Sequence, residues 1–211
     1  MVQTESVTLP SSAWTTDRVR IAGLAAIVGG VLYALTYLEN TIPAISPGGS
    51  LYWLLGLVAI TAYGLIAVGL WAVHSRFSQQ YGRVGTALVY LITLTLATMI
   101  VGSAMNVLAP TLVDPTQEGA TLGGTIWGLA MFATLILATG YGIVLWRAGV
   151  SRLGAGLLVV NLPLFIGGLV ALSALGTVIG IDLAWLAFGA PFGAAWVALG
   201  AQLRADATPA V

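Results

Sequence analysis

Residues 51–76 read LYWLLGLVAITAYGLIAVGLWAVHSR, with no Asp, Glu, Lys or Arg before Arg76. A membrane-spanning helix needs about 20 predominantly apolar residues, so this stretch is long enough to cross a bilayer. The whole chain is 59% hydrophobic and 7% charged, whereas a soluble domain carries roughly 25% charged residues. The sequence therefore predicts an all-α integral membrane protein, with the bilayer as solvent for most of the chain.

Six segments of the 211-residue chain meet the same requirement. We expect them at about 20–41, 51–75, 84–108, 121–146, 153–178 and 182–203. Residues 18–204 should then form one bundle of six transmembrane helices between short tails at 1–17 and 205–211. The first tail has no base, unlike a cleavable secretory signal, so the first span is expected to remain in the mature protein.

The basic residues predict the orientation of this bundle. The chain has no lysine, and its seven arginines are Arg18, Arg20, Arg76, Arg83, Arg147, Arg152 and Arg204. They all fall at the same end of the expected helices, and cytoplasmic loops carry an excess of basic residues. Both termini are therefore expected in the cytoplasm. The preference for arginine over lysine, with abundant Ala, Gly and Val, suggests a prokaryotic plasma membrane.

The aromatic residues agree with the predicted position of the helix ends, because Trp and Tyr are enriched at the two membrane interfaces. Those expected at the outer interface are Tyr52, Trp53, Trp127 and Trp185, and those at the inner interface are Trp71 and Trp146. Trp196 does not fit, because it lies about two turns inside the last span.

Acidic residues mark the outer ends of the helices. Glu39 is the strongest candidate for a functional residue among them. It lies beside Asn40 at the outer end of the first span, and no Arg or Lys is expected on that side to pair with it. A carboxylate at this depth usually faces a protein interior or a water-filled cavity. Glu39 and Asn40 are therefore candidate binding residues, unless Glu39 only reaches headgroup water. A candidate acidic entrance is formed by Asp114, Glu118 and Asp182.

Two amides and the single histidine complete the candidate site residues. Asn106, near the outer end of the third span, is expected at the level of Glu39. Asn161 lies in the middle of the fifth span, where Pro163 frees a backbone carbonyl one turn earlier and a polar pocket could open. The alternative for both amides is hydrogen bonding between helices. His74, before the exposed loop expected at 76–83, is either a pH switch or an ordinary interfacial residue.

Small residues predict close helix packing. Three pairs have the spacing that lets helix backbones approach each other, namely Gly124 and Gly128, Gly176 and Gly180, and Gly189 and Gly193. We interpret them as packing within one bundle, with dimerisation as the alternative.

The residue types argue against several classes of chemistry. The chain has no cysteine and one histidine, so no metal ligand set is expected, and we assign no catalytic residue. A zero formal net charge gives no reason to expect a nucleic-acid partner.

The preferred function is a structural or accessory subunit that contacts other membrane subunits or a second copy. The alternatives are a small transporter or channel for a cation, proton or neutral apolar solute, entered near Glu39, and a binder of lipid or carotenoid pigment or an intramembrane enzyme.

Overall fold

The computed structural model describes residues 14–37, 44, 51–108, 122–175 and 181–207, and these residues form helices and no strands. The helices are α1 (Thr16–Thr36), α2 (Tyr52–Leu108), α3 (Leu122–Arg147), α4 (Arg152–Leu175) and α5 (Ile181–Asp206). The all-α prediction is thereby confirmed. Of these helices, α1, α2 and α3 are long and apolar enough to cross a membrane.

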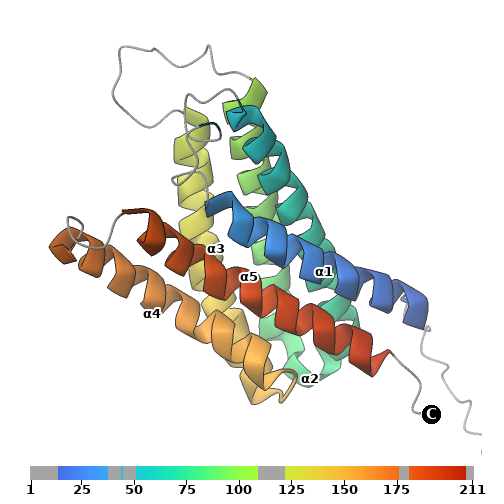
Figure 1. Cartoon of the computed structure of the whole chain (residues 1–211). Coiled ribbons are helices and arrows are strands. Elements are labelled where there is room, and N and C mark those ends of the chain that lie inside the picture. Colours follow the sequence, from blue (N-terminus) through green and yellow to red (C-terminus); the bar gives the residue numbers. More distant parts are fainter. Residues whose placement is uncertain (1–13, 38–43, 45–50, 109–121, 176–180, 208–211) are drawn as a thin grey trace, which may run out of the picture.

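Helix α2 contains two of the expected spans. Its 57 residues are interrupted at Gly82, whose φ of 63° and ψ of −157° are not helical. A residue without Cβ adopts positive φ at little cost, so Gly82 lets the chain fold back on itself. The resulting arms, 52–81 and 83–108, lie side by side in Figure 1, and Gly56 of the first arm directly faces Val107 of the second. The described chain thus has five helices where six were expected.

The residues around this break also differ from the sequence prediction. We expected an exposed loop at 76–83, but the first arm stays helical up to Tyr81 and only Gly82 departs from helical geometry. Two residues of this segment, Phe77 and Tyr81, are buried in the core. Their burial explains why the polar stretch between them is not released as a loop.

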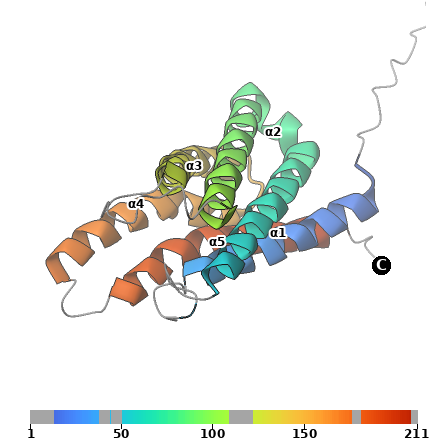
Figure 2. The same ribbon diagram turned by 90° about the horizontal axis from the view of Figure 1, so that it is seen from above.

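The helices form two layers. One layer holds α1, α5 and α4 side by side, and the other holds α3 and the two arms of α2 (Figure 1). The layers cross at a steep angle, as the view from above also shows (Figure 2). Neighbouring helices of a membrane bundle usually cross at about 20°, and the two layers cross more steeply than that.

The arginine-bearing ends of the helices lie together. Trp14 and Thr16, at the start of α1, line one hollow with Arg76 of α2 and Asp206 of α5. The side chain of Gln202 donates a hydrogen bond to the backbone carbonyl of Val150, in the turn between α3 and α4. The start of α1, the break in α2, the turn between α3 and α4 and the end of α5 thus lie at one end of the molecule, which is called the arginine end below.

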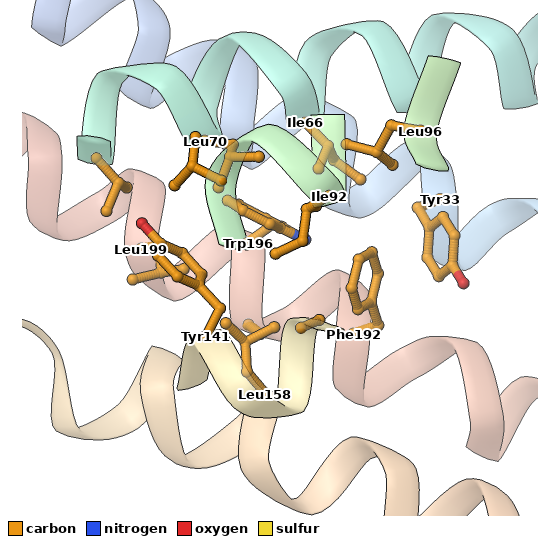
Figure 3. Packing of buried hydrophobic residues seen from close by; sticks show 14 of the residues in the cluster. Tyr33, Ile66, Leu70, Ile92, Leu96, Tyr141, Leu158, Phe192, Trp196 and Leu199 are labelled. Carbon is orange, nitrogen blue, oxygen red and sulfur yellow. The ribbon is translucent and has the colours of Figure 1, made fainter. Parts of the chain in front are cut away.

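The core lies where the two layers meet. Figure 3 shows Trp196, Phe192 and Leu199 of α5 packed against residues from the other four helices. Those partners include Tyr33, Ile66, Leu70, Ile92, Leu96, Tyr141 and Leu158. Trp196 is fully buried there, which explains why it did not fit either aromatic belt.

Glycines bring the backbones of α1 and α5 into direct contact. A Cβ at Gly193 would strike the carbonyl oxygen of Gly30, and a Cβ at Gly200 would strike that of Gly23. Gly189 likewise lies against the ring of Tyr37. The Gly189 and Gly193 pair therefore packs within the chain. Gly128 has open space around it, and the Gly176 and Gly180 pair lies outside the described residues.

Candidate functional site: an aromatic pocket

A pocket lies at the end of the molecule opposite the arginine end, where α1, both arms of α2 and α3 converge. Its cavity volume is about 100 Å³. We call it the aromatic pocket; its lining residues are Thr36, Tyr37, Tyr52, Leu55, Gly56, Ala59, Tyr63, Ser103, Asn106, Val107 and Trp127. This lining combines aromatic rings with hydroxyl and amide groups, and the described residues contribute no acidic or basic side chain to it.

Hydrogen bonds fix the aromatic rings of this region. The indole N–H of Trp127 donates to the hydroxyl of Tyr63, with 2.8 Å between nitrogen and oxygen. Two further hydroxyls, those of Tyr33 and Tyr37, share a buried hydrogen bond of 2.8 Å. The ring of Tyr33 meets Tyr63 edge to face, with 6.1 Å between centroids. The rings thus form one connected cluster from α1 to α3, and their orientation is set before any ligand enters.

Small residues make room for the pocket and bring its walls together. In the first arm of α2, Gly56 and Ala59 line the cavity where larger side chains would fill it. In the second arm, a Cβ on Gly102 would lie 2.8 Å from both the carbonyl oxygen of Gly123 and the backbone nitrogen of Trp127. The start of α3 therefore packs directly on α2, and this contact positions Trp127 at the wall.

The inner end of the pocket is closed by packed side chains. Tyr63 is only 1% exposed, although it lines the cavity. One turn further along the same arm, Ile66 is fully buried, and Leu96 and Met99 of the other arm are buried as well. Within the described residues, the pocket therefore ends at the Tyr63 ring and does not continue toward the arginine end.

Of the site residues predicted from sequence, Asn106 lines the pocket. Its side-chain oxygen lies against the backbone of Gly123, where any Cβ would collide with it. Glycine at 123 is therefore what allows the amide to occupy this position, between the second arm of α2 and the first turn of α3.

Glu39, Asn40, Asp114 and Glu118 lie outside the described residues. In the sequence, Glu39 follows the lining residue Tyr37 by two positions. Asp182 lies in the first turn of α5.

Asn161 is not part of the aromatic pocket. It lies in the middle of α4, is 1% exposed, and neither atom of its amide group has a hydrogen-bond partner among the described residues. Pro163 follows it, yet α4 continues as a helix through both positions. The interhelical hydrogen bond expected as one alternative for Asn161 is not found among the described residues, and a polar pocket at Asn161 stays a prediction.

His74 lies toward the arginine end of α2. Its Nδ1 atom is 2.8 Å from the Tyr81 hydroxyl, and its ring meets Trp71 edge to face. Tyr81 in turn faces the ring of Tyr141 across 5.9 Å. His74 is thus held by aromatic neighbours at a distance from the pocket, and its role as a pH switch stays a prediction.

Sequence reasoning missed the aromatic residues that form the pocket. Tyr52 and Trp127 were assigned to an aromatic belt, because their level in the expected helices is that of the outer interface. Tyr37 and Tyr63 were not singled out. The available signal was the clustering of Tyr37, Tyr52 and Trp127 at the level of Asn106, near four helix ends.

The described residues contain no group of three or more His, Asp or Glu side chains able to hold a metal ion. Comparison of the chain with protein-family models, curated proteins and solved structures found no match.

Proposed function

We propose that this chain is a multi-pass membrane protein that binds a small organic cation, or the ammonium end of a larger molecule, in the aromatic pocket. The observation that carries the proposal is the composition of the lining. Tyr37, Tyr52, Tyr63 and Trp127 surround a small cavity together with the amide of Asn106. Aromatic cages of this type attract ammonium groups through the negative potential of their ring faces.

The distribution of charge also favours a cation. Among the residues that the structure describes, no acidic or basic side chain lines the pocket, and all seven arginines belong to the opposite end of the helices. Glu39 follows the pocket residue Tyr37 after one intervening residue. A cation in the pocket would therefore meet hydroxyl and amide oxygens and ring faces, and the arginines at the other end of the helices would not repel it.

The size of the cavity limits the ligand. At about 100 Å³ it is smaller than the ~150 Å³ cavity that holds benzene in an engineered protein. A methylated ammonium group is of suitable size. A carotenoid would need a far larger cavity, since even drug-sized ligands occupy about 300–1,000 Å³. The pigment-binding alternative therefore receives no support from this pocket.

The closed inner end favours binding over conduction. A channel needs a continuous path, whereas the pocket ends at Tyr63, whose hydroxyl accepts the Trp127 hydrogen bond. Transport would require this contact to open. We therefore propose a binding function first, and carriage of the bound cation across the membrane only as an extension of it.

The proposed orientation places the pocket outside the cell. The arginine end would face the cytoplasm of a prokaryotic cell, following the positive-inside rule. Both termini would then be cytoplasmic, with the two arms of α2 as separate spans. Under this orientation the ligand enters from the outer side.

A structural or accessory role remains the second candidate. It is supported by the outer face of α4, where Leu153, Leu164 and Val170 expose apolar side chains away from α3 and α5. Another membrane subunit could cover this face. Because lipid would cover it equally well, this observation supports the second candidate less than the aromatic pocket supports the first.

The proposal is tested by titrating the purified full-length protein in detergent with tetramethylammonium chloride, using calorimetry. Replacing Trp127→Leu removes one ring face and should weaken binding about fivefold or more. Trp53→Leu is the matched control, because Trp53 lies in the same region of α2 but is 50% exposed and does not line the pocket. Equal affinities for the two variants would contradict the proposal, provided that both keep the helical circular dichroism of the parent.

A further inference from the structure

We propose that a groove between α1 and α5 at the arginine end binds the headgroup of an anionic phospholipid. The groove has a volume of about 290 Å³ and is lined by Arg20, Ile27, Ala201, Arg204 and Ala205. Two guanidinium groups from different helices thus border one groove with an apolar wall. The inference is independent of the aromatic pocket, which lies at the other end of the helices.

The glycine contact between the helices creates this arrangement. A Cβ on Gly23 would lie 2.8 Å from Cγ of Arg204 and 2.8 Å from the carbonyl oxygen of Gly200. The aliphatic stem of Arg204 therefore lies across the surface of α1 at Gly23. Arg20 is located about one turn before Gly23 on α1, so the two arginines flank the close contact from opposite helices.

Two neighbouring guanidinium groups suit a phosphate. Each guanidinium offers planar pairs of N–H donors that match the oxygens of a phosphate group. A second arginine adds donors for the remaining oxygens and a second positive charge, and charge-assisted hydrogen bonds of this kind are roughly twice as strong as neutral ones. Of the described residues, those that line the groove include no acidic side chain.

Two acidic residues near this end of the molecule, Asp17 and Asp206, do not line the groove. Asp206 lines a separate hollow together with Ser75 and Arg76. Asp17 lies in the first turn of α1 and lowers the net positive charge of this end, but it does not line the groove. The positive potential inside the groove therefore comes from Arg20 and Arg204.

The apolar part of the groove distinguishes a lipid from a free phosphate. Ile27 and Ala201 line it on the side toward the middle of the helices. On the surface of α1 next to Arg20 and Ile27, large apolar side chains are exposed in a row, namely Ile21, Leu24, Val28 and Val31. Acyl chains attached to a bound phosphate would cover this row. Basic pockets of this kind, between helices on the cytoplasmic side, bind anionic headgroups in membrane proteins.

The test uses delipidated full-length protein in detergent, titrated with phosphatidylglycerol or with phosphatidylcholine of the same acyl chains, and bound lipid is counted by native mass spectrometry. Phosphatidylglycerol should bind more tightly. Arg20→Gln and Arg204→Gln should each weaken its binding about fivefold. Arg152→Gln, at the start of α4, is the control and should leave binding unchanged.

Two further measurements distinguish a lipid site from misfolded arginine variants and from a site for free phosphate. Ala201→Leu narrows the groove from an exposed position without changing its charge, so it should also weaken phosphatidylglycerol binding if the arginine variants fail to fold. Inorganic phosphate at the same concentration as the lipid should not displace it. The proposal is overturned if the two lipids bind equally, if Arg152→Gln weakens binding as much as the groove variants, if Ala201→Leu has no effect, or if inorganic phosphate competes.

Discussion

The indole N–H of Trp127 donates to the hydroxyl of Tyr63 at 2.8 Å, joining α3 to the first arm of α2 across 64 positions of the sequence. This bond closes one wall of the aromatic pocket at its inner end. It is made between two rings that both line the cavity, so it connects the stability of the helix packing to the shape of the site.

Tyr63→Phe should destabilise the protein by about 1–3 kcal/mol, because the partly buried indole N–H of Trp127 loses its acceptor. The ring itself is kept, so packing against Tyr33 should persist. Thermal unfolding in detergent measures the change. Tyr90→Phe is the control, since Tyr90 is in the other arm of α2 and is 58% exposed. Equal melting temperatures for the two variants would show that the hydrogen bond does not stabilise the fold.

The contact between α1 and α5 predicts a strong effect of one methyl group. Gly30→Ala should lower the free energy of unfolding by about 1–3 kcal/mol, because the added Cβ meets the backbone of Gly193 and overpacks the contact. Gly128→Ala is the matched control in α3, where a Cβ meets no atom within 4 Å. That variant should be neutral or slightly more stable. Unfolding curves that reverse this order would contradict the backbone contact.

The break in α2 predicts a conformational cost without any steric clash. Gly82→Ala should destabilise the protein by about 1–2 kcal/mol, because alanine is strained at a φ of 63°. Gly64→Ala, where a Cβ also meets no atom within 4 Å, lies in regular helix and should gain about 0.5–1 kcal/mol. Chemical unfolding of the two variants separates these effects. A stability gain in both would mean that residue 82 is helical and that the chain does not fold back there.

Replacing the buried amide in α4 should stabilise the protein, whereas the substitutions at Tyr63, Gly30 and Gly82 should destabilise it. Asn161→Leu should raise the free energy of unfolding by about 1 kcal/mol or more, because the amide is buried without a hydrogen-bond partner among the described residues. A melting temperature that falls by several degrees would instead reveal that Asn161 binds a group essential to the fold.

The sequence predicted much of the helical structure, because long apolar stretches between arginines leave few alternatives. The expected first span, 20–41, overlaps α1, and the expected fourth, 121–146, nearly coincides with α3. The position of the second and third spans was also predicted. The helical geometry of residues 76–81 was not predicted, and neither was the confinement of the break to Gly82, because a positive φ at this one position is not distinguishable in a chain with 27 glycines.

The site was less predictable for a physical reason. Asn106 stood out because an amide near an apolar span is unusual, whereas Tyr and Trp at the same level are expected at any membrane interface. Whether Trp127 faces lipid or Tyr63 depends on how α3 packs against α2, and that packing is set by Gly102 and Gly123. The crossing of the two layers likewise depends on close contacts of α1 with α2, where Gly29 lies against the backbone of Ile66 and Gly69 lies against Ala26. Periodicity alone does not encode these contacts.

The central claim is that the aromatic pocket selects a positive charge, and one calorimetric comparison tests it most directly. The unmodified protein is titrated with tetramethylammonium chloride and, separately, with the neutral tert-butanol, which has a similar shape but no charge. Cation–π attraction in a desolvated site is worth about 2 kcal/mol, so we predict that tetramethylammonium binds at least tenfold more tightly. Equal affinity for the two compounds, or binding of neither, would contradict the claim.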